Sequence, residues 1–336
     1  MIIHSFELLN FTMKSFTQLG EQFEAYLSTY ELPDNPAQLY KPLNYILSIG
    51  GKRIRPKLVL AAYNLYKEDV GFAFEAAMTV EFFHNFSLLH DDIMDDADMR
   101  RGKPSVHIKY DTNSAILSGD VMLIYAYKFL EKYTGHNLKL FSLTTKTSIE
   151  VCEGQRMDMD FETRNDVAIE DYIRMIELKT SVLIGGALQM GAIIGEASSD
   201  DQQHLYEFGR NIGIAFQIQD DLLDTFGDQS LVGKEIGGDI RQKKKTYLFL
   251  KSLDLLSKEQ ADRLKELYAV EGDPMSEEQV AEVTSLFQAA HVNVHCEELK
   301  LVYQQLAFSH LDAVNVDHEK KSIIRLFAQE LLEREK

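Results

Sequence analysis

The chain has 336 residues and a mass of 38.4 kDa, and its 35 Lys and Arg against 53 Asp and Glu give a formal net charge of −18. Nucleic-acid binders usually present a basic surface, so this balance argues against nucleic-acid partners. Hydrophobic residues make up 45% and charged residues 26%, which excludes wholesale disorder. Only two cysteines occur, Cys152 and Cys296, so a disulfide framework is excluded and a reducing compartment is expected.

No segment has the length and composition of a membrane span. The longest apolar run, residues 182–195, has 14 residues including Gln189, fewer than the ~20 that a transmembrane helix needs. It is more typical of a helix buried in a core. The N-terminal stretch contains His4 and Glu7 and so lacks the apolar region of a signal peptide. We therefore expect a cytoplasmic protein with no transmembrane segment.

The spacing of prolines predicts an all-α fold. Pro33, Pro36 and Pro42 predict one loop over residues 32–42, and Pro56 follows a glycine pair, as at a helix start. No proline occurs between residues 104 and 274, which permits long helices because proline costs ~3 kcal/mol inside one. Apolar residues recur at helical spacing over residues 58–66, 74–89 and 205–223. We expect a single all-helical domain over residues 1–336, ending in a polar helical tail beyond about residue 272.

An acidic cluster follows the second of these ranges, with five aspartates among residues 91–98. On a helix, Asp91 and Asp95 would lie one turn apart and Asp92 about 100° round from Asp91. Such like charges repel each other, and a hard divalent cation such as Mg²⁺ would offset the repulsion. Taken alone, the cluster is more typical of a solvated acidic helix end or N-cap than of a metal site.

The same D-D-x-x-D spacing recurs at Asp220, Asp221 and Asp224, at the end of an otherwise apolar helical stretch. Acidic side chains there are costly unless they face a polar cavity or a cation. Two helices with matched acidic ends can face each other and hold metal ions together. The repeat therefore predicts a Mg²⁺ site built from both motifs.

Basic residues near these motifs suit a phosphate ligand. Residues 50–56 place Lys52, Arg53 and Arg55 on a glycine-opened turn at a helix start, where backbone N–H groups favour anions. Arg100 and Arg101 follow the first acidic motif, and arginine binds phosphate bidentately. Their alternative role is to pair with Asp96 and Asp98.

Further basic residues occur in the second half of the chain. Lys179 lies between two apolar helical stretches, and Lys234 lies in the glycine-rich loop over residues 226–245. The three lysines at 243–245 suit either a phosphate or a solvated surface. His84 precedes Asp91 by seven residues and shares its helix face, so it suits a binding role, although a lone histidine is more often structural. Together these residues predict one or two diphosphate sites.

The chain resembles the trans-isoprenyl diphosphate synthases, or polyprenyl synthetases, in three strings: GGKRIRP, HDDIMDDADMRRGKPS and FQIQDDLLD. These are followed by GK-x₄-D and by a lysine before Thr246. The resemblance is to the short-chain type, such as geranylgeranyl or farnesyl diphosphate synthases. The resemblance covers about residues 40–250, with the motifs in the family's order. It implies a bundle of long helices around a deep central cavity, usually a homodimer, that joins isopentenyl diphosphate head to tail (1'-4) to an allylic diphosphate.

The resemblance also implies roles for individual residues. Six aspartates would hold Mg²⁺, as three ions once the diphosphate is bound: Asp91, Asp92, Asp95, Asp220, Asp221 and Asp224. Three cations would contact the allylic diphosphate: Arg100, Lys179 and Lys234. Five residues would bind isopentenyl diphosphate: Gly51, Lys52, Arg55, His84 and Arg101. Thr180 and Gln217 would line the reacting region, and Gln155 and Asp158 match another family segment. Lys244 aligns with a later family lysine, but Lys243 replaces the glycine before it, which leaves open which of these lysines contacts substrate.

The chemistry suits these residue types. Breaking a C–O bond to diphosphate concentrates negative charge that divalent ions, Lys and Arg stabilise, while an apolar pocket protects the allylic cation from water. The departing diphosphate is the expected base, so no catalytic His or Cys is needed. In the family, the residues four and five before the first aspartate, here Ser87 and Phe86, set product length. An aromatic ring at Phe86, about 7.5 Å below Asp91 along a helix, predicts a C20 product, with C15 next. Simple core packing is the other role for Phe86.

Three alternatives differ in what they predict. A terpene cyclase would share the first acidic motif but would not need the isopentenyl site. A His-Asp phosphohydrolase, suggested by His84, His90 and Asp91, would release phosphate without chain growth, and would not account for Asp220 to Asp224. A non-catalytic helical partner of another synthase would be expected to lose an acidic motif, whereas both are intact.

Overall fold

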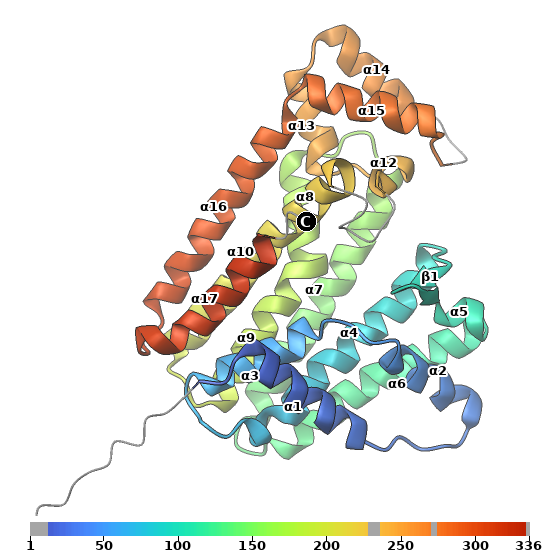
Figure 1. The fold of residues 1–336 in the computed structure, drawn as a ribbon. Helices are drawn as coiled ribbons and strands as arrows, with labels where there is room; N and C mark the ends of the chain where they lie inside the picture. Colours follow the sequence, from blue (N-terminus) through green and yellow to red (C-terminus); the bar gives the residue numbers. More distant parts are fainter. Residues whose placement is uncertain (1–12, 228–235, 270–273, 334–336) are drawn as a thin grey trace, which may run out of the picture. The chain divides into compact units, whose positions relative to one another are not determined.

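A computed structural model describes residues 13–227, 236–269 and 274–333 (Figure 1). The predicted all-α class is confirmed, because these residues form helices apart from one two-stranded hairpin. The chain divides into two compact units. Unit 1 comprises residues 1–137, 188–199 and 316–324, and unit 2 comprises residues 138–187, 200–315 and 325–336. The expectation of a single domain over residues 1–336 stays a prediction.

Unit 1 contains the N-terminal helices. Its elements are α1 (Phe16–Thr29), α2 (Ala37–Ser48), α3 (Ile54–Asn64), the 3₁₀ turn η1 (Val70–Ala73), α4 (Phe74–Met94), β1 (Met99–Arg100), β2 (Lys103–Pro104), α5 (Val106–Lys109), α6 (Thr112–Lys128) and the 3₁₀ turn η2 (Phe129–Lys132). Helix α4 is the centre of this unit and packs against α3 and α6. Its side chains from Ala76 to Phe83 are all buried, and six of these eight are apolar, as expected for a helix that is packed on every side.

The predicted loop over residues 32–42 is wrong at its C-terminal end. Helix α2 begins at Ala37 and contains Pro42 within it. Pro42, Leu43 and Ile46 are all buried, so burial of this apolar face offsets the backbone hydrogen bond that the proline cannot make.

A tight hairpin follows α4. Arg100 pairs with Lys103 across antiparallel strands β1 and β2. The two residues between them, Arg101 and Gly102, have φ values of 53° and 74°. Two positive φ angles are what a two-residue hairpin turn of the favoured hand requires, and glycine adopts such an angle without steric cost. The turn thus directs Arg100 and Arg101 back along the end of α4.

Unit 2 contains the longest helices. Its elements are α7 (Asn137–Thr163), α8 (Ile169–Ile176), the π-helical turn η3 (Glu177–Ser181), α10 (Ser199–Phe226), α12 (Gly238–Arg241), α13 (Tyr247–Leu255), α14 (Lys258–Ala269), α15 (Glu277–Ala289) and α16 (Val292–Ala313). Helices α9 (Val182–Ile194) and α17 (His318–Leu332) each pass from one unit into the other. The apolar run at 182–195 forms α9 and is buried except at Gln189, as predicted.

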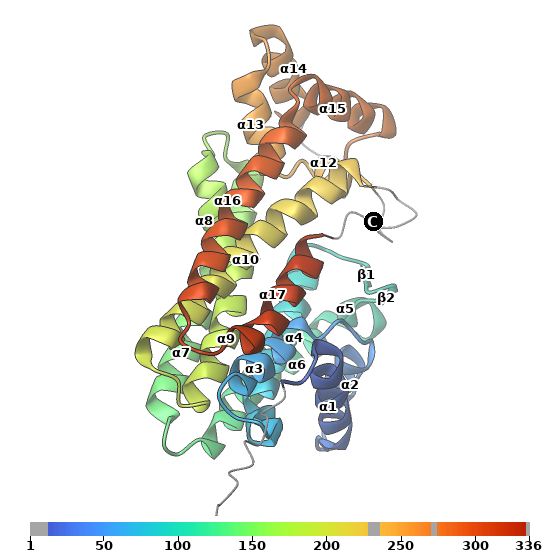
Figure 2. The same cartoon turned by 60° about the vertical axis from the view of Figure 1, so that its left-hand side comes forward.

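Helices α10 and α16 run side by side in opposite directions (Figure 2). Lys300 Nζ donates to Gln219 Oε1 over 2.5 Å near one end of the pair, and the Nδ1 atoms of His204 and His310 lie 3.1 Å apart near the other. The buried cluster of unit 2 includes Phe161, Tyr172, Ile218 and Tyr247. This core fixes α8, α10 and α13 against one another.

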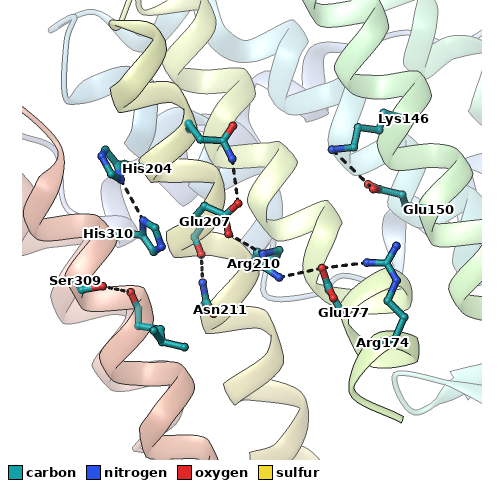
Figure 3. Close-up of polar contacts among 12 residues, drawn as sticks. Lys146, Glu150, Arg174, Glu177, His204, Glu207, Arg210, Asn211, Ser309 and His310 are labelled. Atoms are coloured by element: carbon teal, nitrogen blue, oxygen red, sulfur yellow. Dashed lines mark hydrogen bonds and ion pairs between the residues drawn. The ribbon is translucent and has the colours of Figure 1, made fainter. Parts of the chain in front are cut away.

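A chain of ion pairs holds the turn η3 to α10 (Figure 3). Glu177 Oε1, at the start of the turn, accepts from Arg210 Nη1 over 3.0 Å and lies 3.2 Å from Arg174 Nη1. Arg210 also donates from Nε to Glu207 over 2.7 Å. The turn therefore has a fixed register against the helix that contains the second acidic motif.

In the described part of the chain, every helix is too short or too polar to cross a membrane. Neither cysteine forms a disulfide; Cys152 is exposed and Cys296 is buried.

Candidate active site

The first acidic motif lies at the C-terminal end of α4. Asp91 and Asp92 belong to its last turn, and Asp95 caps it, donating its backbone N–H to Asp91 O over 2.8 Å. The C-terminal end of a helix already has partial negative charge, so carboxylates are disfavoured there. Neither helix propensity nor the helix dipole explains why aspartates occur here. A bound cation would explain them, because it would offset their negative charge.

Asp92 is the buried member of the motif, 1% exposed. Its Oδ1 accepts from Arg100 Nε over 2.9 Å and also from Arg100 Nη2, while its Oδ2 is buried without a hydrogen-bond partner. Burial raises the pKa of Asp92 above its ordinary value even though Arg100 is present. The alternative pairing of Arg100 with Asp96 or Asp98 is therefore wrong, because the hairpin returns Arg100 to Asp92.

A cationic pocket of about 390 Å³ opens beside α4 in unit 1. Its lining residues come from the start of α3, from α4 and from the hairpin turn: Gly51, Lys52, Arg53, Ile54, Arg55, Glu81, His84 and Arg101. Gly51 has a φ of 141°, and a methyl group on it would lie 2.8 Å from the Arg101 guanidinium carbon. Any larger residue at position 51 would therefore require the end of the Arg101 side chain to shift.

The pocket's positive charge is concentrated around His84. Arg55 Nη1 lies 3.1 Å from His84 Nε2, and because guanidinium has only donors, this nitrogen of His84 is the acceptor and the ring is neutral. Burial and the neighbouring arginines lower the pKa of His84 well below its ordinary value. Burial also lowers the pKa of Arg55 to about 10, so Arg55 stays charged at neutral pH.

Among the lining residues, Arg53 is held by two glutamates. Its Nη1 donates to Glu81 over 2.5 Å, its Nε to Glu24 over 2.8 Å and its Nη2 to Leu47 O over 2.6 Å. Glu81 also accepts from Asn85 Nδ2 over 2.7 Å. Arg53 is therefore a structural cation, and Glu81 is a buried counter-charge to the cations that line the pocket.

The predicted length-determining residues lie on α4 before the motif. Phe86 is buried, with its ring 5.6 Å from that of Phe83 and 4.8 Å from that of His90 between centroids. Ser87 is half-buried and donates from its hydroxyl to His84 O over 2.8 Å.

The second acidic motif lies near the C-terminal end of α10 in unit 2, again where the helix dipole disfavours it. Asp220 is exposed, Asp221 is buried and Asp224 is half-buried. Asp224 Oδ2 accepts from the backbone N–H of Asp239, the aspartate of GK-x₄-D, over 2.9 Å. Within the predicted loop 226–245, the described residues 236–245 thus contact the motif and contain the short helix α12.

Both oxygens of Asp221 accept hydrogen bonds. Oδ2 accepts from the Tyr172 hydroxyl, and Oδ1 accepts from Gln217 Nε2 over 2.9 Å. Gln217 Oε1 in turn accepts from the Thr180 hydroxyl over 3.3 Å. Burial, then the charge of Asp239, raises the pKa of Asp221 well above its ordinary value.

Lys179 is presented by the π-helical turn η3. Its Nζ donates to Asp158 Oδ2 over 2.5 Å. The turn touches Gly154 of α7 so closely that a methyl group there would lie 2.3 Å from Lys179 N. The next residue of α7, Gln155, has a buried side-chain amide with no hydrogen-bond partner at either of its two polar atoms.

The three neighbouring lysines differ. Lys245 Nζ donates to Phe161 O over 2.6 Å and Glu162 O over 3.1 Å, so it caps the C-terminal end of α7. Lys244 Nζ lies 3.6 Å from Asp239 Oδ1. Lys243 has a left-handed φ of 56°, an angle that glycine adopts readily. Lys234 lies outside the described residues.

A second pocket, in unit 2, brings many of the predicted residues together. Its lining residues include Asp158, Lys179, Thr180, Gln217, Asp221, Asp239, Lys244 and Lys245. Unit 1 in turn brings together Asp91, Asp92, Asp95 and Arg100 with the cationic pocket. Among the described residues, no group of three or more His, Cys, Asp or Glu side chains forms a metal site by itself. Joint metal binding by the two motifs stays a prediction.

Several residues at these sites were not predicted from the sequence as site residues, and three of them have charged or hydroxyl side chains that matter for the argument. They are Tyr172, Glu81 and Asp239. Tyr172 could have been suspected, because a tyrosine on an apolar helical face needs a partner for its hydroxyl. Nothing in the local pattern distinguishes Glu81 from a surface glutamate, since its burial depends on how α3 packs on α4.

Comparison with known proteins defines the class. A family model described as polyprenyl synthetase matches residues 36–287. A crystal structure of a geranylgeranyl pyrophosphate synthase superposes with a TM-score of 0.91 at 44% identity, covering 96% of this chain and 100% of that one. A geranylgeranyl diphosphate synthase of Methanosarcina mazei is 36% identical over 89% of this chain and 91% of its own. A geranylfarnesyl diphosphate synthase of Natronomonas pharaonis is 35% identical over 90% and 92%.

The chain belongs to the polyprenyl synthetase family. The resemblance found in its motifs is thereby confirmed, as is the prediction of an isoprenoid-type prenyltransferase that makes short-chain prenyl diphosphates.

Proposed function

We propose that this protein is a geranylgeranyl diphosphate synthase that elongates an allylic diphosphate with isopentenyl diphosphate, 1'-4, to a C20 product. The main support is the chemistry of the two pockets. A cationic pocket beside one acidic helix end suits a diphosphate held by cations, and a second acidic helix end beside Lys179 suits a diphosphate held through metal ions.

Isopentenyl diphosphate is assigned to the cationic pocket. Lys52, Arg55 and Arg101 supply positive charge, and the glycine at position 51 lets Arg101 approach the backbone. Guanidinium groups suit the diphosphate oxygens because they can donate in pairs. His84 is a neutral neighbour that fixes Arg55 by accepting its hydrogen bond.

The carboxylates of both motifs fit Mg²⁺, since they are hard oxygen donors and Asp92 Oδ2 is buried without a hydrogen bond. Asp91, Asp92 and Asp95 are assigned to it in unit 1, and Asp220, Asp221 and Asp224 in unit 2. When bound, the ions would neutralise the charge that develops on the departing diphosphate. Arg100, Lys179 and Lys234 are assigned to the same diphosphate as direct donors.

The remaining site residues hold groups in place. Thr180 and Gln217 form a hydrogen-bonded pair beside Lys179, and so align the turn η3 with α10. Lys244 rather than Lys245 is assigned to substrate, because both contacts of Lys245 go to the end of α7. The apolar side chains at Phe86 and Phe83 would exclude water from the allylic chain.

The test is an incubation of the purified protein with radiolabelled isopentenyl diphosphate, Mg²⁺ and C5, C10 or C15 allylic primers, with product length read by chromatography. We expect a C20 product from each primer, loss of activity with EDTA and recovery with added Mg²⁺. Diphosphate release from the primer without isopentenyl incorporation would instead support a terpene cyclase, and phosphate release without chain growth would support a phosphohydrolase.

We further propose a homodimer. Helix α6 exposes Ile116, Leu117 and Ile124, the last of them 65% exposed. Large apolar side chains gathered on one helix favour an interface. Light scattering during gel filtration should give the mass of two chains, and the mass of one chain would contradict the proposal. The cytoplasmic location stays a prediction.

A further inference from the structure

The carboxylate of Asp221 is the most deeply buried of the second motif, and both of its oxygens accept hydrogen bonds. Asp221 is 4% exposed, whereas Asp220 is exposed and Asp224 half-buried. One of its oxygens accepts from the phenol of Tyr172 and the other from the amide of Gln217. A carboxylate held on both sides cannot rotate without breaking a buried hydrogen bond, which is costly.

The position of the Tyr172 hydroxyl is fixed by the core around its ring. It belongs to α8, is 1% exposed, and lies 49 residues from Asp221 in sequence. Its ring packs in the core of unit 2 with Ile218 and Tyr247, so the ring holds the hydroxyl in place. A phenol is a hydrogen-bond donor at neutral pH. Its contact with Asp221 is thus a directed interaction from a rigid element.

The hydrogen bonds continue from Asp221 to the turn η3. Gln217 lies one turn before Asp221 on α10 and accepts from Thr180, the residue after Lys179. The arrangement therefore runs from Tyr172 through Asp221 and Gln217 to Thr180. It links α8, α10 and η3, three elements that are otherwise held by apolar packing and by the ion pairs of Arg210.

We propose that Tyr172 is a positioning residue of the second acidic motif: its hydroxyl, opposite Gln217, fixes the Asp221 carboxylate and so sets the orientation of the motif relative to Thr180 and Lys179. This inference rests on the proposed function. It distinguishes Asp221, a fixed and buried carboxylate, from Asp220, which is exposed at the end of the same helix. If Tyr172 had only a structural role, its ring would contribute to packing and loss of its hydroxyl would leave the activity unchanged.

The test compares Tyr172→Phe, which removes only the hydroxyl, with Tyr247→Phe, which removes a hydroxyl from the same core. Loss of an outer hydrogen bond to a metal-binding carboxylate typically costs about 10- to 100-fold. We therefore expect kcat of Tyr172→Phe to fall about 10- to 100-fold while the KM for isopentenyl diphosphate, assigned to unit 1, stays unchanged. Binding of Mn²⁺ with inorganic pyrophosphate, measured by calorimetry without turnover, should weaken by about 10-fold or more. Tyr247→Phe should match the wild type in kcat, in the KM for isopentenyl diphosphate and in Mn²⁺ binding.

A double variant shows whether Tyr172 acts through Asp221. In an Asp221→Asn background, Tyr172→Phe should cause little further loss, because the two residues act as a unit. Additive losses, or a Tyr172→Phe enzyme with wild-type kcat and Mn²⁺ affinity, would overturn the inference. If the wild type itself incorporates no isopentenyl diphosphate, the proposed function fails instead.

A spectroscopic measurement does not depend on how Tyr172→Phe folds. In protein labelled with ¹³C at tyrosine Cζ, Asp221→Asn should shift the Tyr172 resonance and leave that of Tyr247 in place. An unchanged Tyr172 resonance would contradict the proposed contact.

Discussion

At the scale of single residues, buried charges define the candidate site in unit 1. Arg53 and Glu81 are both almost fully buried and bonded to each other over 2.5 Å. Such a pair gives little net stability, but the loss of one partner leaves the other charge uncompensated. Arg53 also adopts a left-handed φ of 46° just before α3, so the pair fixes the turn that presents Lys52 and Arg55.

Arg53→Met should therefore destabilise the protein by about 3–5 kcal/mol, because Glu81 stays buried without its counter-charge. The measurement is chemical denaturation monitored by circular dichroism. Arg263→Met, which breaks the exposed pair with Glu282, is the control and should change the midpoint little. Adding Glu81→Leu to Arg53→Met should recover part of the loss, and a double variant that is less stable than Arg53→Met would contradict the explanation.

At the scale of elements, both acidic motifs occupy the end of a helix where backbone electrostatics oppose them. The motif of α4 lies in its last turn and cap, and the motif of α10 in its last two turns. Helix propensity and the helix dipole both disfavour aspartate at these positions. The local preference against aspartate is overridden at the C-terminal ends of both α4 and α10, which is the behaviour expected of functional sites.

The turn η3 shows how one element depends on another. Its π-helical form presents Lys179 beside Asp158, and it fits against α7 only because position 154 is glycine. Extra atoms in a closely packed contact cost about 1–3 kcal/mol and move the backbone. Single-turn π-helices are frequent at functional sites.

Gly154→Ala should lower stability by about 1–3 kcal/mol, because its methyl group would overlap the backbone of Lys179, and should reduce kcat by displacing that lysine. Thermal unfolding and steady-state kinetics measure the two effects. Gly135→Ala is the matched control, since nothing lies within 4 Å of the added methyl group, and it should stay within about 0.5 kcal/mol of the wild type. Equal behaviour of the two variants would rule out the tight contact.

At the scale of the whole molecule, product length is the property that the family leaves open, since relatives of similar identity are named for different products. Phe86 lies about 7.5 Å before Asp91 along α4, from a rise of about 1.5 Å per residue. Its ring is buried against Phe83 and His90 on the same helix. A ring so close to the diphosphate end would stop chain growth early.

Phe86→Ala should therefore extend the product beyond C20, read by chromatography of the dephosphorylated prenols. Phe82→Ala is the control, because it removes the same ring from the side of α4 that contacts Tyr30 and Phe129. It should cost stability, about 3–5 kcal/mol, but leave product length unchanged. The same product from Phe86→Ala as from the wild type would exclude Phe86 as the floor of the cavity.

The sequence by itself determined the helical class, the two acidic motifs, the basic turn before α3 and the family. The first three follow from local rules, since proline spacing, apolar period and charge repeats act over a few residues. The family follows from the resemblance of the motif strings. It misjudged Pro42, whose cost to α2 is offset by burial that no local pattern reveals.

Only the tertiary structure decided which charges have partners. It paired Arg100 with Asp92, Arg53 with Glu81, and Lys245 with the end of α7. It also brought Tyr172 to Asp221 across 49 residues. The physical reason is that the partner of a buried charge is chosen by how distant helices pack, because desolvation penalises any charge that packing leaves alone.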